Sequence, residues 1–106
     1  MEDMSTMTIG SVHIQMIDTP GPTKNAASLV VNHIAKDCSE APFLFSGSTL
    51  FIGGCGQIGH GGGSRQMIFS LRRLMENLPD DTLLFSGHEN AVKNLEFAKW
   101  IEPGNF

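Results

Sequence analysis

The chain has 106 residues, of which 41% are hydrophobic and 17% charged, and its formal net charge is −4 with histidine neutral. This length predicts one small domain or a piece of a larger one. The acidic balance excludes a general electrostatic attraction to nucleic acid, and no apolar run reaches the roughly 18 residues of a membrane span. The first residues lack the layout of a signal peptide. Two cysteines, Cys38 and Cys55, make no disulfide framework. We therefore expect a reducing, cytoplasmic setting.

The first half of the chain predicts short strands separated by turns. Ser11–Asp18 alternates with period two, which places Val12, Ile14 and Met16 on one face of a strand. Thr19-Pro20-Gly21-Pro22 must end that strand, because proline removes backbone donors. Three further segments are expected to be strands: Ala26–Ile34, Phe43–Phe45 and Thr49–Ile52. A polar loop over residues 35–42 is expected between the first two of these.

The second half predicts two helices around one more strand. Ser64 is expected to cap the first helix, which ends at Pro79, and Leu83–Phe85 is expected to be a short buried strand. The first helix should bury a stripe made by Met67, Leu71, Leu74 and Leu78, with Ile68 and Met75 beside it. After a turn at residues 87–89, the second helix should bury Ala91, Val92, Leu95, Ala98 and Ile101 and stop at Pro103-Gly104.

These elements predict a sheet with one face that the chain cannot cover. The strand segments FLF, TLFI and LLF are apolar on both faces, whereas two helices of about 12 residues cover one side only. The other face needs a partner sheet, a second chain or further residues. We therefore expect a homo-oligomer or a complex with a partner half-domain.

Seven of the twelve glycines lie between Gly53 and Gly63. The stretch contains a G-x-G-x-x-G pattern at Gly54–Gly59, directly after an expected strand, which is the spacing of a dinucleotide loop. The expected helix opens only near Ser64, so this context disfavours a dinucleotide. His60 and the three glycines after it look like a lipase-type oxyanion loop, but there is no G-x-S-x-G nucleophile elbow. A plain glycine loop is the favoured interpretation.

No complete active site is visible from side-chain chemistry alone. The four histidines, His13, His33, His60 and His88, show no metal-ligand spacing, and a zinc site needs three or four converging ligands. Ser48 and Cys55 have no evident base beside them in the sequence. We therefore assign no catalytic residue.

Several segments together resemble a known family. In order and spacing they are similar to glyoxalase II (hydroxyacylglutathione hydrolase), of the metallo-β-lactamase superfamily. They are Asp18–Thr23 (DTPGPT), Phe45–Gly56 (FSGSTLFIGGCG), Leu78–Thr82, Phe85–Asn90, Asn94–Ala98 and Glu102–Asn105. The resemblance covers residues 8–106. It implies an α/β (α+β) fold: half of an αββα sandwich, with a mixed sheet of four to six strands and two helices on one face. The expected domain is therefore 1–106, a single truncated metallo-β-lactamase-like domain.

The resemblance also assigns metal-ligand positions, and most of them are altered here. The T-H-x-H-x-D-H motif of the family's first half is absent from this sequence. Pro22 stands where the family has a histidine ligand, Ala26 where it has a further histidine, and Ser48 where it has a bridging aspartate. His88 is the one family ligand that is kept. By the same comparison Cys55, Gly56 and Gln57 occupy the substrate loop, with Gln57 in place of a basic residue that contacts glutathione.

These changes predict that metal-dependent chemistry has been lost. A serine hydroxyl and a proline cannot replace a bridging carboxylate and an imidazole, and without a metal no water is activated. We expect a glyoxalase II-like protein that is inactive as it stands, with no cofactor of its own where the family has zinc or iron. Two alternatives stay open. One is a hydrolase of the S-lactoylglutathione type, completed by a partner or a longer parent chain. The other is a binder of a small ligand, of the glutathione type, at the glycine loop.

Overall fold

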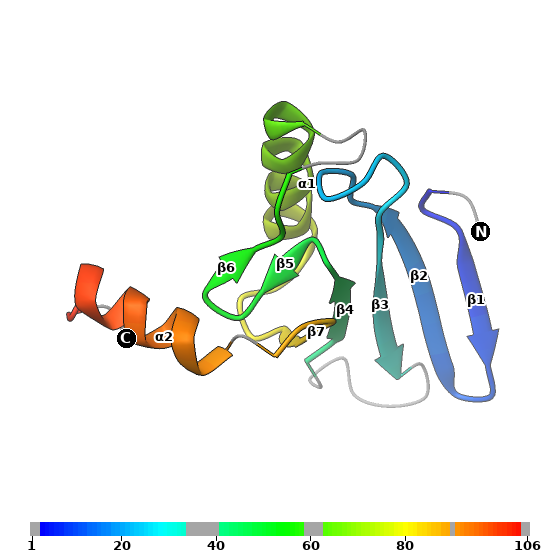
Figure 1. Ribbon diagram of the computed structural model, residues 1–106. Helices are drawn as coiled ribbons and strands as arrows, with labels where there is room; N and C mark the ends of the chain where they lie inside the picture. Colours follow the sequence, from blue (N-terminus) through cyan, green and yellow to red (C-terminus); the bar gives the residue numbers. More distant parts are fainter. Residues whose placement is uncertain (1–2, 34–40, 59–62, 90, 105–106) are drawn as a thin grey trace.

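The computed structural model describes residues 3–33, 41–58, 63–89 and 91–104, with His33 described as backbone only. Five strands form one mixed sheet in the order β1-β2-β3-β4-β7 (Figure 1). Their bounds are β1 Thr6–Ile9, β2 Val12–Asp18, β3 Ala27–His33, β4 Phe43–Gly47 and β7 Leu83–Ser86. A separate two-stranded hairpin is made by β5 Leu50–Phe51 and β6 Gly54–Cys55, and the helices are α1 Ser64–Asn77 and α2 Ala91–Ile101.

The sheet is antiparallel except at its last pair. The strands β1 to β4 run antiparallel to their neighbours, and β4 and β7 pair in parallel through the crossover that contains α1. Because β4 and β7 are parallel, their carboxyl ends lie at the same edge of the sheet. The residues that follow these two strands are therefore brought together from distant parts of the sequence.

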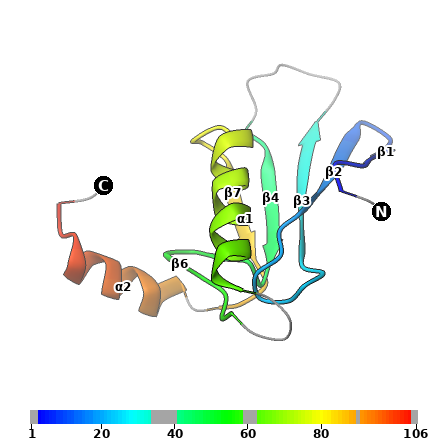
Figure 2. The same cartoon turned by 90° about the horizontal axis from the view of Figure 1, so that it is seen from above.

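Helix α1 covers one face of the sheet and forms the core with it (Figure 2). Ile17, Val30 and Leu44 point to this face from three neighbouring strands and pack with Leu74 of the helix; all four side chains are at most 3% exposed. Leu50, Leu78 and Leu84 pack around this cluster. Burial of four such apolar side chains contributes about 1.5–3 kcal/mol each, so α1 is the main element holding this face.

Helix α2 extends away from the sheet in both views (Figures 1 and 2). None of its described residues is buried. Asn94 ties it to the hairpin by donating from Nδ2 to the carbonyl oxygen of Ile52 at 3.1 Å. Its large apolar side chains are exposed, including Val92, Leu95, Phe97, Trp100 and Ile101. The expected mixed sheet is thus confirmed, but among the described elements α1 is the helix that covers its face, since no side chain of α2 is buried.

The opposite face of the sheet, here named the apolar sheet face, is apolar across its middle, with Asp18 of β2 at one end of it. Cross-strand register places two continuous rows on it, Leu29–Phe45–Phe85 and Val31–Phe43–Leu83. The Phe45 and Phe85 rings stack at 5.1 Å between centroids. The full set is Met7, Ile9, Val12, Ile14, Met16, Leu29, Val31, Phe43, Phe45, Leu83 and Phe85. Seven of these are 37–61% exposed.

Most expected elements are confirmed, and some details differ. The alternation in β2 is as expected, β3 begins one residue after the expected Ala26, and α1 ends just before Pro79, whereas β1 was not expected. The cap at Ser64 is wrong: Gly63 is the N-cap, in extended conformation and without a side-chain cap bond, so Ser64 is already the first helical residue. Of the loop expected over residues 35–42, residues 35–40, with Cys38, lie outside the described residues.

Two expectations about burial are also corrected. Leu83 and Phe85 of β7 are 50% and 48% exposed, because no described part of the chain packs on the apolar sheet face. In α1, Met67 and Leu74 are buried in the stripe that faces the sheet. Ile68 and Met75 lie beside that stripe and are 52% and 78% exposed.

Candidate functional site

Three buried hydroxyl groups fix the loop that follows β2. Thr19 Oγ1 lies 2.9 Å from Ser28 Oγ and 3.1 Å from Thr49 Oγ1, and Thr49 Oγ1 donates to the Thr19 carbonyl oxygen at 2.9 Å. All three side chains are fully buried. A buried hydroxyl is tolerated only where it is hydrogen-bonded. This cluster therefore ties the loop at residues 19–23 to β3 and to the turn between β4 and β5.

Glycines allow the turn after β4 to approach its neighbours closely. Gly47 has a φ of +56°, a conformation that favours glycine, and its carbonyl oxygen accepts a hydrogen bond from the Gly87 N–H at 2.8 Å. A Cβ atom at Gly56 would overlap the carbonyl oxygen of Ser48. The backbone around Ser48 is thus enclosed by the ends of two strands and by the start of the glycine loop.

Ser48 and His88 meet at the carboxyl edge of β4 and β7. Ser48 Oγ lies 3.0 Å from His88 Nε2. The His88 ring stands 4.9 Å from the Phe51 ring, centroid to centroid, and the His88 carbonyl oxygen accepts a hydrogen bond from Ser86 Oγ at 2.9 Å. Both side chains of the pair are exposed, so the pair is accessible from solvent.

A cavity of about 480 Å³ opens at this pair. Its lining is Pro22, Thr23, Ser48, Phe51, Gly56, Gln57 and His88. Three of the four family ligand positions in this half, Pro22, Ser48 and His88, therefore lie around one cavity, whereas the fourth, Ala26, does not line it. Gly56 and Gln57, expected at a substrate loop, line the same cavity. Cys55, expected beside them, is exposed in β6 and does not line it.

The Ser48–His88 contact is the feature that sequence reasoning missed. The two residues are 40 positions apart, and neither flanks the other in a recognisable motif. The signal that could have found them is topological, because Ser48 is the first residue after β4, His88 is the second after β7, and the two strands pair in parallel. Residues after parallel neighbouring strands meet at one edge of the sheet.

The donor set of this cavity does not fit the dinuclear metal centre of the resembled family. Pro22 offers no side-chain donor atom, Ser48 offers a neutral hydroxyl, and the Nε2 atom of His88 is engaged with that hydroxyl. A zinc site needs three or four nitrogen, sulfur or carboxylate ligands. Across the part of the chain that the structure describes, no group of three or more His, Cys, Asp or Glu side chains is placed to hold a metal ion.

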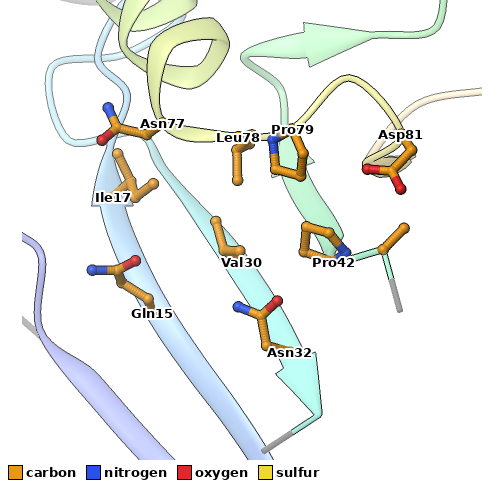
Figure 3. Close-up of a pocket in the computed structure, with 10 residues that line it drawn as sticks. Gln15, Ile17, Val30, Asn32, Pro42, Asn77, Leu78, Pro79 and Asp81 are labelled. Carbon is orange, nitrogen blue, oxygen red and sulfur yellow. The ribbon is translucent and has the colours of Figure 1, made fainter. Parts of the chain in front are cut away.

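A second cavity, of about 540 Å³, lies on the α1 face of the sheet near the end of that helix (Figure 3). Gln15 and Asn32 project into it from β2 and β3, and Asn77, Pro79 and Asp81 border it from the segment that follows the helix. It holds amides and one carboxylate, and it contains none of the family ligand positions. We assign it no function.

Comparison with known proteins gives close relatives in sequence. No protein-family model matches the chain. It is 38% identical over 105 residues to a hydroxyacylglutathione hydrolase of Dictyostelium discoideum, a match covering 99% of this chain and 38% of the relative. It is 41% identical over 100 residues to a hydroxyacylglutathione hydrolase-like protein of Gallus gallus, covering 93% of this chain and 34% of the relative. The chain thus spans little more than a third of the length of these relatives.

Solved structures place the fold. ETHE1 from Myxococcus xanthus matches with a TM-score of 0.69 and 27% identity, covering 84% of this chain and 36% of that one. A di-iron-bound form of TTHA1623 matches with a TM-score of 0.61 and 26% identity, covering 83% and 39%. A metallo-β-lactamase from Staphylococcus aureus matches with a TM-score of 0.69.

The five-stranded sheet with its crossover helix is therefore part of a metallo-β-lactamase fold, as expected from the sequence. Within that superfamily the chain is glyoxalase II-like, since its relatives are named hydroxyacylglutathione hydrolase or hydroxyacylglutathione hydrolase-like. One of these neighbours, TTHA1623, is a di-iron-bound form. No described helix is long and apolar enough to cross a membrane.

Proposed function

We propose that this glyoxalase II-like chain does not carry out metal-dependent thioester hydrolysis with its own residues. The observation that supports this is the cavity where the family ligand positions converge, which holds Pro22, Ser48 and His88. A neutral hydroxyl cannot offset the charge of two cations as a bridging carboxylate does. One imidazole hydrogen-bonded to that hydroxyl is too small a donor set for zinc or iron.

Metal content and thioester turnover on one purified sample test this proposal. We expect substoichiometric zinc and iron by elemental analysis, and no chelator-sensitive hydrolysis of S-lactoylglutathione. Stoichiometric metal with chelator-sensitive turnover that is lost in His88→Ala would contradict it. The matched control is His13→Ala, since His13 lies in β2 and lines no part of the cavity.

The role that this leaves is that of an interaction module, and we propose a second copy of the chain as its partner. The apolar sheet face supports this. Its seven most exposed side chains present roughly 700 Å² of apolar surface, taking about 200 Å² for a large apolar side chain. A standard interface buries about 800 Å² per partner. A face that is apolar across its middle can meet its own copy under two-fold symmetry, and two such faces pack as the sheets of a β-sandwich do.

Light scattering tests the dimer. We expect the wild-type chain to be a dimer, Phe45→Glu to be a monomer because it places a charge in the middle of the interface, and Phe69→Glu to stay dimeric. Phe69 is the matched control, since it is 59% exposed on α1 and away from the apolar sheet face. A monomeric wild-type chain would exclude a second copy, and the face would then be left for the sheet of a different half-domain.

Two alternatives have support of their own. The chain spans 38% of a relative named hydroxyacylglutathione hydrolase, which favours a thioester hydrolase completed by a partner or a longer parent chain. That alternative predicts stoichiometric metal and chelator-sensitive turnover, the two results that would contradict the main proposal. Gly56 and Gln57 line the cavity, which favours a small ligand of the glutathione type at the glycine loop. A thermal shift on adding glutathione distinguishes this alternative from the others.

A relative from Arabidopsis thaliana is named cytoplasmic, which supports a cytoplasmic location.

A further inference from the structure

Ser48 and His88 replace the altered metal site with a different chemical arrangement. We propose that they form a nucleophile and general-base pair, which transfers the acyl group of a small activated ester or thioester to water without a metal ion. The contact between Ser48 Oγ and His88 Nε2, at 3.0 Å, lies within the 2.6–3.2 Å that such pairs require. The pair opens directly into the cavity of about 480 Å³.

The structure holds both partners in place. Ser48 sits on a turn whose backbone is confined by Gly56 and by the Gly47–Gly87 hydrogen bond. The His88 ring is flanked by Phe51, and its backbone carbonyl is held by Ser86. A base that is positioned before the substrate arrives does not have to be ordered during the reaction.

The cavity lining indicates the class of substrate. Its polar side chains besides the pair are Thr23 and Gln57, both neutral, and no lysine or arginine of the described chain lines it. A phosphate or carboxylate would therefore find no cation there. A third cavity, of about 740 Å³, also includes His88, and its lining combines apolar side chains with the charged Glu89 and Lys93. The neutral lining of the cavity at the pair favours a short, uncharged acyl group.

The proposed reaction has two balanced steps. In the first, Ser48 Oγ attacks the acyl carbon, its proton passes to His88 Nε2, and the bond from the acyl carbon to the leaving oxygen or sulfur breaks as that atom takes the proton. In the second, water attacks the acyl-serine carbon, gives its proton to His88, and the ester bond to Ser48 breaks as the serine oxygen recovers the proton. No oxidant, reductant or metal is needed.

The test is the reaction of the full chain with p-nitrophenyl acetate in the presence of a chelator. We expect release of p-nitrophenol and an acetyl group on the peptide that contains Ser48, found by mass spectrometry. A general base contributes roughly 100- to 10,000-fold, so His88→Gln should slow acylation by about 100-fold or more. Ser48→Ala should abolish the adduct. Ser64→Ala is the matched control and should react as the wild type does, because Ser64 is exposed at the start of α1.

Three results would overturn the proposal: no adduct on Ser48 in the wild-type chain, unchanged acylation in Ser48→Ala, or unchanged acylation in His88→Gln. Both substitutions are at exposed positions, and circular dichroism checks that each variant is folded. This inference does not depend on the absence of metal-dependent hydrolysis. The chelator removes any metal-dependent activity from this assay. Metal content and thioester turnover are measured separately, on protein to which no chelator has yet been added.

Discussion

Replacing Thr49 by valine tests whether the buried hydroxyl cluster holds the candidate site. The Thr49 side chain is fully buried, and its hydroxyl contacts both the carbonyl oxygen of Thr19 at 2.9 Å and the Thr19 hydroxyl at 3.1 Å. Valine keeps the shape and removes the hydroxyl. The Thr19 hydroxyl retains Ser28 as a partner, but the Thr19 carbonyl oxygen loses the donor that the Thr49 side chain gives it.

The expected magnitude follows from these contacts. A buried polar group left without its partner costs about 1–3 kcal/mol, against a total stability of about 5–15 kcal/mol for a domain. Each kcal/mol lowers the Tm of a domain near this size by roughly 4–8 °C. Because Thr49 follows Ser48 directly, we also expect slower acylation of Ser48 in this variant.

Thermal unfolding measured at one protein concentration checks this prediction, since an associating chain has a concentration-dependent Tm. Thr8→Val is the matched control, because Thr8 is exposed in β1 and a surface change of this kind stays within about 0.5 kcal/mol. If Thr49→Val and Thr8→Val had the same Tm as the wild type, the hydroxyl cluster would not be what fixes the loop at residues 19–23.

Three further predictions concern single positions. Gly56→Ala should destabilise the chain by about 1–3 kcal/mol in chemical unfolding, because its Cβ atom meets the Ser48 carbonyl, whereas Gly104→Ala, with open space around it, should be neutral. Ser48→Asp should bind zinc more tightly than the wild type in a calorimetric titration, because it adds a carboxylate beside His88; equal affinity would contradict the placement of these side chains. Arg73 Nη2 donates to Asp3 Oδ2 at 2.7 Å, and this bond, with a second from the Asp18 N–H, lowers the pKa of Asp3 from 3.8. The unfolded state therefore binds the proton more readily than the folded state does. The contribution of Asp3 to the free energy of unfolding should be present above pH 3.8 and lost as the pH falls through the lowered pKa. It should stay below about 1 kcal/mol, because the pair is exposed. The stability difference between the wild type and Asp3→Asn should vanish over that range, and a constant difference would contradict this.

Local patterns in the sequence predicted the strands and helices well where one face is buried. The alternation of Val12, Ile14 and Met16 with Gln15 and Ile17 predicted the strand and the residues that share a face, because side chains along a strand alternate with period two. The hairpin strand β6 was not expected, since its two residues, Gly54 and Cys55, have no strand propensity and pair only because the chain turns back on Leu50 and Phe51.

Properties that depend on distant residues were not predictable in this way. The sequence predicted an uncovered sheet face but not which side chains lie on it, so Phe85 was expected to be buried and is exposed. The altered ligand positions were visible from the resemblance, but the contact between Ser48 and His88 depends on the parallel pairing of β4 and β7. Tertiary topology, and not any local motif, creates that pair.

The most direct test of the central claim is the zinc and iron content of the purified chain, measured beside its hydrolysis of S-lactoylglutathione. The converging positions Pro22, Ser48 and His88 supply one metal-ligating side chain. We therefore predict metal well below stoichiometric amounts and no chelator-sensitive turnover. Stoichiometric zinc or iron, with turnover that a chelator abolishes and His88→Ala eliminates, would contradict the account.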